Sequence, residues 1–546
     1  MGERRRQWCA CFSLLNDGQA PIYWNLGGVV LSGRRSIFQS AMLLTAASLG
    51  LRTISMVFQV YLSNLVGAAG IGLLQLTMSV GMLAGTIGTA GVRVAAMYLC
   101  AEEHGHRRPA GIRLAMRYCF FYALMLSIAA GLALIHFSTP LAENWIQDPR
   151  AAAGLRVFGA FLPVSVLWAV LDGYFTATGR IGRLVAVESG ERIVSMLLTV
   201  SLLRFWAGGD IERACCAMIF GSGAASAIGL LFILQLYWRE QRAICPGPQA
   251  RRSMMGRLLR LAVPVGFNDI LRGGLSTLEH LLIPRGLARS GSSSENAMAA
   301  YGTIHGMVFP ILMFPAAVLF ALSDLMVPEL ASSTARHSKR RILHMTDKCL
   351  RMGLLFAASI SGAIYCVAGP LGWQLYHSTD AGYYLRIFAP LIFILYMDTI
   401  VDGMHKGLGQ QIHCVRYNTF TSLLDVILLF FLLPRFGISG YFFSFTATHA
   451  VNFYLSITRL VKVTGYAPPL HYVLKILLCS LAAIFLTSQL TAGWTALPGW
   501  LFCLLCAGIY LMVLTVLVAL SRACSAEDWR WLWNTVRGKN PSAVED

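Results

Sequence analysis

Long apolar stretches are the feature that most constrains this chain. They follow one another from residue 37 to residue 521 with only short polar connections between them. About 14 of these stretches reach the length of roughly 20 apolar residues that a membrane-spanning helix needs. They fall at 37–63, 71–100, 112–137, 151–177, 184–205, 211–237, 257–285, 297–328, 342–369, 381–405, 412–434, 437–460, 470–490 and 497–521. Because a helix satisfies its own backbone hydrogen bonds in lipid, the sequence predicts an all-α polytopic membrane protein.

The composition agrees with this class and excludes others. Of the 546 residues, 56% are hydrophobic and only 13% are charged, whereas soluble domains have about 25% charged residues. A net charge of +18 would suggest nucleic acid in a soluble protein, but here the basic residues lie in loops between apolar stretches. That placement indicates membrane topology. Most of the 14 cysteines lie inside apolar stretches, and Cys9 and Cys11 form a lone C-x-C. We therefore expect no nucleic-acid partner, no metal site and no cofactor.

The loops alternate in charge along the chain. Arg and Lys gather in every second loop, with dense groups at 239–257, 336–341 and 522–539. Basic loops stay on the cytoplasmic side, so both termini are predicted to be cytoplasmic, as an even number of spans also requires. The loops on the other side are short and leave no room for a separate domain.

The two halves of the chain resemble each other. LRTISMVFQVYL from Leu51 aligns with LRGGLSTLEHLL from Leu271, so that Arg52 matches Arg272 and Gln59 matches Glu279. Further on, a second pair of segments aligns, matching Gly173 with Gly403 and Gly179 with Gly409. Internal repeats are common in transporters, with the site between the repeats. We expect two pseudo-symmetric six-helix bundles in parallel orientation, followed by two C-terminal helices.

This repeat sets the predicted organisation of the chain. The segments are a cytoplasmic tail (1–35), an N-terminal six-helix bundle (36–237), a cytoplasmic linker (238–256), a C-terminal six-helix bundle (257–462), transmembrane helices 13 and 14 (463–521) and a cytoplasmic tail (522–546).

The span at 257–285 carries unusual polar groups. Asn268, Arg272, Ser276 and Glu279 share one helical face. A charge at mid-bilayer costs about 3 kcal/mol on insertion scales, so this face must be paired or hydrated. One interpretation is a structural ion pair between Arg272 and Glu279, two turns apart. The other is a water-filled cargo cavity lined by this helix.

The first span repeats the pattern with Arg52 and Gln59. If Arg52 and Arg272 face each other across the two halves, the guanidinium groups would repel unless an anion lies between them. Phosphate suits such a place, because its oxygens match the guanidinium fork. Arg93 is a third basic candidate, although a side chain reaching the cytoplasmic interface explains it equally well.

Acidic and histidine residues also occur inside spans. Asp172, Asp398 and Asp402 are candidates for binding a coupling ion, H⁺ or Na⁺; the alternative for each is an interhelical salt bridge. His305 and His449 are lone histidines, for which a structural hydrogen bond and a proton relay are both open. The chain has no P-loop, G-x-S-x-G or H-E-x-x-H motif, so we expect no enzyme and no catalytic residues.

Two long segments carry a family resemblance. LTAASLGLRTISMVFQVYLSNLVGAAGIGLLQL, followed by TAGVRVA, resembles the start of the stage V sporulation protein B group. LAVPVGFNDILRGGLSTLEHLLIPRGLARSG and YGTIHGMVFPILMFPAAVLFALSDLMVPELA resemble the seventh and eighth spans of that group. It comprises polysaccharide flippases of the multidrug/oligosaccharidyl-lipid/polysaccharide exporter superfamily. This chain departs from the group's pattern at Gln59, where Arg is common, and at Arg93, where Pro is frequent.

The resemblance implies fourteen helices, alternating access and movement of lipid-linked oligosaccharide precursors across a bacterial plasma membrane. It also implies a role in cell-wall, peptidoglycan, polysaccharide or spore-cortex assembly, with membrane lipids as the other partners. Three alternatives stand beside it: a cation-coupled multidrug exporter of the same superfamily, a membrane-bound glycan ligase or transferase, and a scaffold without transport. Exporters usually have twelve spans, a transferase would need clustered acid–base residues, and a scaffold would not explain buried charges.

Overall fold

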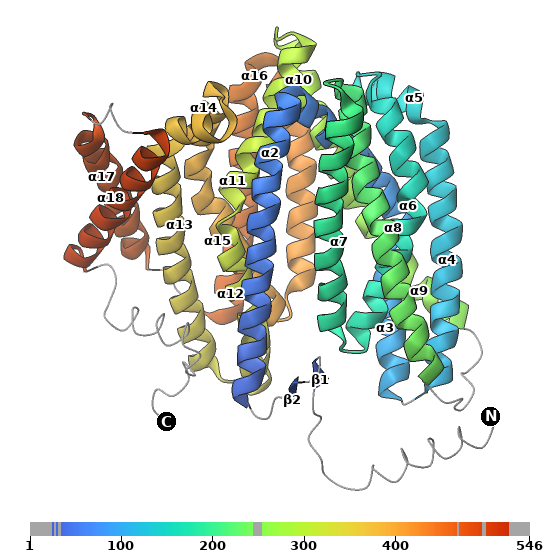
Figure 1. Ribbon diagram of the computed structural model, residues 1–546. Helices are drawn as coiled ribbons and strands as arrows, with labels where there is room; N and C mark the ends of the chain where they lie inside the picture. The colour runs from blue at the N-terminus through green and yellow to red at the C-terminus, as the bar shows by residue number, and fades with distance from the viewer. Residues whose placement is uncertain are drawn as a thin grey trace. The chain divides into compact units, whose positions relative to one another are not determined.

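The computed structural model describes residues 25–26, 29–30, 34–106, 108–243, 254–466, 469–493 and 498–522 (Figure 1). Most of the two predicted tails and the middle of the predicted linker lie outside this part of the chain. Two-residue strands β1 (Asn25–Leu26) and β2 (Val29–Val30) pair antiparallel. The remaining described elements are helical, as the sequence predicted.

The helices fall into long spans and short connecting turns. The α-helices are α2 (Arg34–Thr89), α3 (Val92–Gly105), α4 (Pro109–His136), α5 (Ser138–Pro140), α6 (Ala151–Ala177), α7 (Ile181–Leu202), α8 (Ile211–Ala243), α9 (Met254–Arg289), α10 (Ser294–Gly302), α11 (Phe309–Met313), α12 (Ala316–Ala335), α13 (Lys339–Tyr376), α14 (Thr379–Phe388), α15 (Ile392–Gly407), α16 (Gln411–Thr464), α17 (Leu470–Thr491) and α18 (Gly499–Leu520). Three π-helical turns, η1 (Leu141–Ile146), η2 (Leu203–Ala207) and η3 (Thr303–Val308), and the 3₁₀ turn η4 (Ala389–Leu391) complete the set.

All the apolar segments predicted from the sequence lie on these helices. Two neighbouring pairs of segments are each joined without a loop, in α2 and in α16. The helix is broken inside α2 at Gly67 (φ 78°, ψ 170°) and inside α16 at Gly437 (φ 55°, ψ −134°). Within the described residues, ten helices are long and apolar enough to cross a membrane. Two predicted spans lie on α16, whereas α2 holds the first predicted span and most of the second, which ends in α3. The all-α, polytopic fold class is therefore confirmed.

The chain forms two compact units whose limits fall inside helices. Unit 1 contains residues 80–274 and the chain before Ser48; unit 2 contains residues 48–79 and everything after Gly274. The limits are thus inside α2 and α9, whereas the predicted bundles end in the linker between α8 and α9. In unit 1, α6 packs against α3, α4 and α8, and α7 packs against α8. In unit 2, α13 packs against α14, α15, α17 and α18, and α15 packs against α12 and α16.

The same close helix contact occurs in each unit. A Cβ atom added at Gly173 would lie 2.6 Å from the carbonyl oxygen of Arg93, between α6 and α3. One added at Gly403 would lie 1.7 Å from Ser323 Oγ, between α15 and α12. Ser323 stands at the same distance from Arg93 in sequence as Gly403 from Gly173. The turns that follow use Gly179 and Gly409, with φ of 71° and 70°. These matches agree with the predicted pseudo-symmetric repeat.

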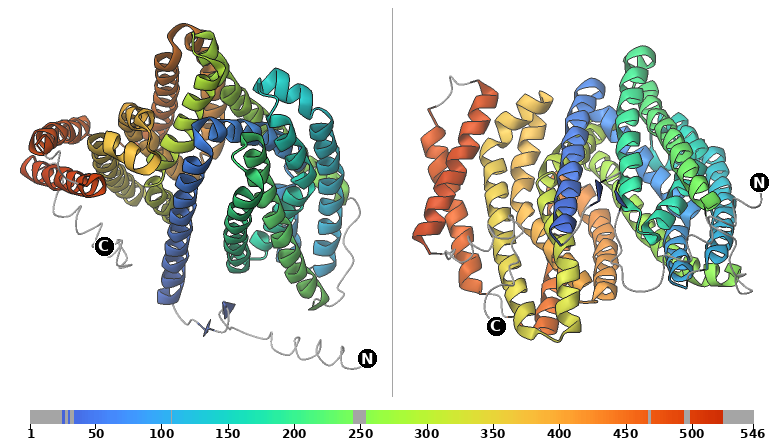
Figure 2. Two further views of the ribbon diagram at one scale, coloured as in Figure 1. Left: turned by 45° about the horizontal axis from the view of Figure 1, so that its top comes forward. Right: turned by 60° about the horizontal axis from the view of Figure 1, so that its bottom comes forward.

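The last two helices, α17 and α18, pack against each other within unit 2 (Figure 2). Tyr510 of α18 anchors them, because its hydroxyl donates to Ala358 O of α13 at 2.9 Å and lies 2.9 Å from Ser480 Oγ of α17. The outer faces of α17 and α18 expose large apolar side chains such as Leu478, Phe485 and Leu504. A surface of this kind suits contact with lipid.

Candidate functional site

The two polar residues of the first span have different surroundings within unit 2. Arg52 is exposed, and its guanidinium carbon lies 5.5 Å from the centre of the Phe320 ring. Gln59 Nε2 donates a hydrogen bond of 3.0 Å to Gly306 O. Pro310 follows Gly306 by four residues and has no N–H, so the usual helical bond to this carbonyl is impossible. Gln59 therefore satisfies a backbone group that a proline leaves without its helical partner.

The polar face of α9 divides between the two units. In unit 1, Asn268 hydrogen-bonds to Asp269, and Arg272 lies beside the same carboxylate with its own side chain exposed. In unit 2, Glu279 forms a side-chain hydrogen bond with Asp425 of α16. Each of the two residues thus has a polar partner within its own unit. The ion pair between Arg272 and Glu279 stays a prediction.

Arg93 and Asp172 pair with each other in unit 1. Arg93 Nε donates to Asp172 Oδ2, joining α3 to α6. The other carboxylate oxygen, Asp172 Oδ1, accepts from Thr176 Oγ1 at 3.2 Å. The arginine side chain is 62% exposed and the aspartate 17%. This arrangement is the interhelical salt bridge that was the alternative interpretation of Asp172, and it engages the guanidinium of Arg93.

A buried pair of carboxyl groups lies in unit 2. Asp425, only 6% exposed, accepts hydrogen bonds at Oδ1 from Ser444 Oγ at 2.8 Å and Thr448 Oγ1 at 3.2 Å, in addition to its bond with Glu279. Two carboxyl groups can hydrogen-bond to each other only while one of them keeps a proton. The sequence analysis missed Asp425, although it is the only acidic residue of the apolar segment 412–434.

The second acidic pair is on α15. Asp398 Oδ2 accepts from Asn452 Nδ2 at 2.8 Å, and Asp402, one turn later, hydrogen-bonds to the Cys414 thiol. Asn452 Oδ1 in turn accepts from Thr421 Oγ1 at 3.5 Å. Thr421 precedes Asp425 by one helical turn, so the two acidic pairs are connected through α16. Both predicted aspartates of the tenth span therefore belong to one polar region within unit 2.

Two histidines considered in the sequence lie near this region. His305, in η3, is 3.1 Å from Tyr441 OH through Nε2. His449 packs its ring against Phe445, with 4.3 Å between ring centres. A third histidine, His280 of α9, is 3.0 Å from Tyr301 OH through Nδ1.

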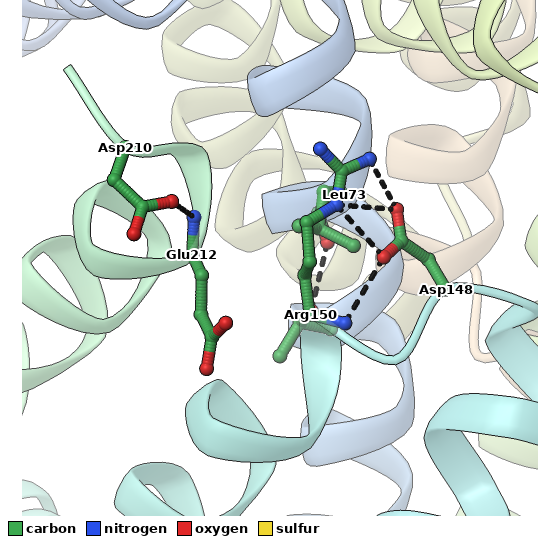
Figure 3. Close-up of polar contacts among 6 residues, drawn as sticks. Leu73, Asp148, Arg150, Asp210 and Glu212 are labelled. Atoms are coloured by element: carbon green, nitrogen blue, oxygen red, sulfur yellow. Dashed lines mark hydrogen bonds and ion pairs between the residues drawn. The ribbon is translucent and has the colours of Figure 1, made fainter.

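Other acidic residues of unit 1 fix short loops (Figure 3). Arg150 Nη2 lies 2.7 Å from Asp148 Oδ2, and the backbone N of Arg150 donates to Asp148 Oδ1 at 3.0 Å. Asp210 Oδ1 accepts from the backbone N of Glu212 at 3.0 Å, at the start of α8. These carboxylates stabilise the turns before α6 and α8.

Comparison with known proteins gives a consistent result. Residues 37–291 match the family described as polysaccharide biosynthesis protein. Stage V sporulation protein B of Bacillus subtilis (strain 168) is 21% identical over 510 residues, covering 88% of this chain and 96% of that protein. The lipid II flippase MurJ in an inward closed conformation superposes with a TM-score of 0.67 at 12% identity, covering 89% of this chain and 98% of that one. An inward-facing multidrug resistance MATE transporter gives a TM-score of 0.56 at 14% identity, covering 76% and 96%.

These findings confirm the resemblance to the stage V sporulation protein B group. They also confirm the fold, because both structural neighbours are helical membrane transporters that align over almost their whole length. At such low identity, the structural neighbours establish architecture and no more.

Proposed function

We propose that this polytopic membrane protein, a homologue of stage V sporulation protein B and of the polysaccharide biosynthesis proteins, is a flippase for a lipid-linked anionic glycan precursor. The observation that carries the proposal is the alignment with 96% of the length of stage V sporulation protein B. The architecture shared with the lipid II flippase supports it. The protein would work by alternating access in the bacterial plasma membrane, without a catalytic step.

Arginine residues are the natural contacts for the phosphate of such a cargo. Arg272 and Arg52 are both exposed, and guanidinium binds phosphate through paired hydrogen bonds. Asn268, one turn before Arg272 on α9, would add a neutral hydrogen-bonding group. Arg93 ranks lower because Asp172 already holds it. We therefore assign the phosphate contact first to Arg272.

An ion gradient would supply the energy, since transport needs a driving force and the chain has no P-loop for ATP. The buried acidic groups of unit 2, namely Glu279, Asp425, Asp398 and Asp402, are the place where binding H⁺ or Na⁺ would change the charge of the protein interior. Asp172 is less suitable, because Arg93 neutralises it. With both termini cytoplasmic, cargo would move from the inner to the outer leaflet.

Reconstitution of the full-length chain tests the proposal. Vesicles would contain a fluorescent polyprenyl-pyrophosphate-linked oligosaccharide, and an impermeant reductant would destroy label in the outer leaflet only. Protein-containing vesicles should lose inner-leaflet label that protein-free vesicles keep. Arg272→Ala should slow this loss about ten- to hundredfold, the value of one charge-assisted hydrogen bond. Arg272→Lys should retain part of the activity, because charge remains while the fork is lost.

Two outcomes would contradict the proposal, one for the function and one for the role of Arg272. If wild-type vesicles keep their inner-leaflet label, the chain is not a flippase for this class of lipid. Full activity of Arg272→Ala, in membranes holding normal amounts of protein, would remove Arg272 from the cargo site. Arg156→Ala serves as the matched control, since Arg156 bonds to Ser138 and Thr139 near the end of α4.

A multidrug exporter is the second candidate function. The multidrug export protein MepA of Staphylococcus haemolyticus (strain JCSC1435) is 20% identical over 363 residues, which is 62% of this chain. That alignment is shorter than the one with stage V sporulation protein B. Efflux of a lipophilic cationic dye from cells, without movement of the lipid-linked oligosaccharide in vesicles, would favour the exporter.

A further inference from the structure

Helix α18 packs against α13 within unit 2, and two contacts define how the helices are aligned. Gly362 of α13 leaves no room for a Cβ atom beside the hydroxyl of Tyr510 of α18. Further along α13, the side chain of Gln374 lies where a Cβ atom of Gly499 would be. Twelve residues forward on α13, from 362 to 374, thus correspond to eleven residues backward on α18, from 510 to 499. The two helices therefore run antiparallel in a constant register.

This register brings two cysteines together. Cys366 follows Gly362 by four residues, and Cys506 precedes Tyr510 by four residues, so each cysteine lies one helical turn from the same contact. The side chains of Cys366 and Cys506 hydrogen-bond to each other. Such a bond requires the two sulfur atoms to face each other across the helix boundary, which is also what a disulfide requires.

Packing as small apolar side chains is the alternative explanation for these cysteines. Here, however, each helix contributes a thiol, and the two thiols are directed at each other. Cys506 also hydrogen-bonds with Thr491 of α17, so its sulfur is held where α13, α17 and α18 meet. Cys366 is half-buried, so a small oxidant can reach its sulfur. Two facing thiols, one of them accessible, meet the chemical requirement for a disulfide.

The position of the pair along the helices narrows the chemistry. Cys366 lies ten residues before the end of α13 at Tyr376, and Cys506 lies seven residues after the start of α18 at Gly499. At 1.5 Å per residue, the thiols are about 10–15 Å inside these helix ends. The loop charges predict that these ends face away from the cytoplasm, and on that side of the membrane disulfides persist.

We propose that Cys366 and Cys506 form a redox site, at which a disulfide bond attaches α18 covalently to α13. Two S–H bonds break and one S–S bond forms, so that two protons and two electrons leave the protein. Because the site lies inside apolar spans, the acceptor must dissolve in lipid. A membrane quinone meets this requirement, since it takes up two protons and two electrons and becomes the quinol. The proposal does not rest on the proposed flippase function.

The disulfide would hold the last two helices on unit 2. In the reduced protein, α18 is attached to α13 by packing and by the hydrogen bond from Tyr510 to Ala358 O. Helix α13 also packs against α14 and α15, so the new bond would join α18 to the middle of the unit. A cross-link between residues 366 and 506 closes a long loop of chain and so restricts the unfolded state. The oxidised protein should therefore unfold at a higher temperature than the reduced protein.

The experiment uses the full-length chain in lipid vesicles, with Cys366 and Cys506 retained and the other cysteines replaced by alanine. A protease site inserted at residues 494–497 allows the chain to be cut between α17 and α18. The protein is first reduced and then treated with a short-chain ubiquinone. Remaining thiols are blocked with N-ethylmaleimide before the cut. On a denaturing gel, the fragment that contains α18 should stay joined to the rest of the chain and should separate after dithiothreitol.

Matched variants locate the bond. One variant retains Cys366 and Cys503, whose thiol lies about one turn from that of Cys506 on the same helix. Its fragment should separate without dithiothreitol, because this thiol is not the one directed at Cys366. A variant that retains Cys506 alone identifies bonds between two copies of the chain. In the chain with all its native cysteines, dithiothreitol should lower the melting temperature, and Cys506→Ala should remove that effect.

Three outcomes would overturn the proposal. The first is a fragment that separates before reduction in the chain with Cys366 and Cys506, although the protein still unfolds cooperatively. The second is equal cross-linking through Cys503 and Cys506, because chance collision of thiols would then explain the bond. The third is a bond that leaves the melting temperature unchanged, which would show that it does not hold α18 in place. A failure of the lipid-crossing assay concerns the flippase alone and does not alter these results.

Discussion

At the residue scale, proline and glycine explain several of the contacts between helices. Pro310 deprives Gly306 O of its usual helical donor, and Gln59 supplies a replacement from α2. Glycine also allows close helix contacts at matching places in the two units, where Gly173 lies against the backbone of Arg93 and Gly403 against the side chain of Ser323. Gln59, selected in the sequence because it is polar, therefore hydrogen-bonds to a backbone carbonyl of a distant segment. The local sequence alone does not reveal this partner.

A double-mutant cycle of Gln59 and Pro310 can test the hydrogen bond from Gln59 to Gly306 O. Gln59→Leu should lower stability by about 1 kcal/mol, because a hydrogen bond to a part-buried carbonyl is lost. In a Pro310→Ala background the same change should cost less, since alanine has the backbone N–H that proline lacks and can restore the helical bond to Gly306 O. Thermal unfolding of the four proteins in detergent measures the cycle. Equal losses in both backgrounds would show that Gln59 does not act through Gly306 O.

At the element scale, the long helices are broken by glycine in conformations that other residues avoid. Gly67 (φ 78°) divides α2, and Gly437 (φ 55°) divides α16. Each break allows two spans to follow without a polar loop, which is why neighbouring apolar segments are separated by so few residues.

A substitution at Gly67 measures the free energy that such a backbone conformation costs a residue other than glycine. A Cβ atom there meets nothing within 4 Å, so Gly67→Ala tests backbone conformation alone. We expect a loss of about 1–3 kcal/mol, because φ 78° with ψ 170° is a conformation that essentially only glycine adopts. Gly50→Ala is the control: its site is helical and equally open, and it should gain about 0.5–1 kcal/mol. Melting temperatures that change equally in both variants would contradict this explanation.

At the scale of the whole molecule, loop charge predicts the orientation in the membrane. Single cysteines would replace Ser292, between α9 and α10, and Ser338, between α12 and α13, in a background without the 14 native cysteines. An impermeant thiol reagent added to intact cells should label position 292 and leave position 338 unlabelled. Labelling of Ser338→Cys alone would reverse the orientation, and with it the direction of cargo movement.

The sequence by itself determined the membrane class, the succession of about fourteen apolar segments, the repeat and the resemblance to stage V sporulation protein B. These follow from hydrophobicity, glycine positions and alignment, which are properties of local segments. It also marked Asp398, Asp402 and Glu279 as unusual, because a charge in an apolar segment is visible without a structure.

Only the tertiary structure decided what these residues contact. The pairing of Arg93 with Asp172, of Gln59 with Gly306 O and of Glu279 with Asp425 joins helices that are far apart in sequence. A buried polar group must find a partner, but many polar groups in other spans can serve. Helix packing selects one of them, and in unit 2 that selection joined Asp425 to Ser444 and Thr448, and Asp398 to Asn452.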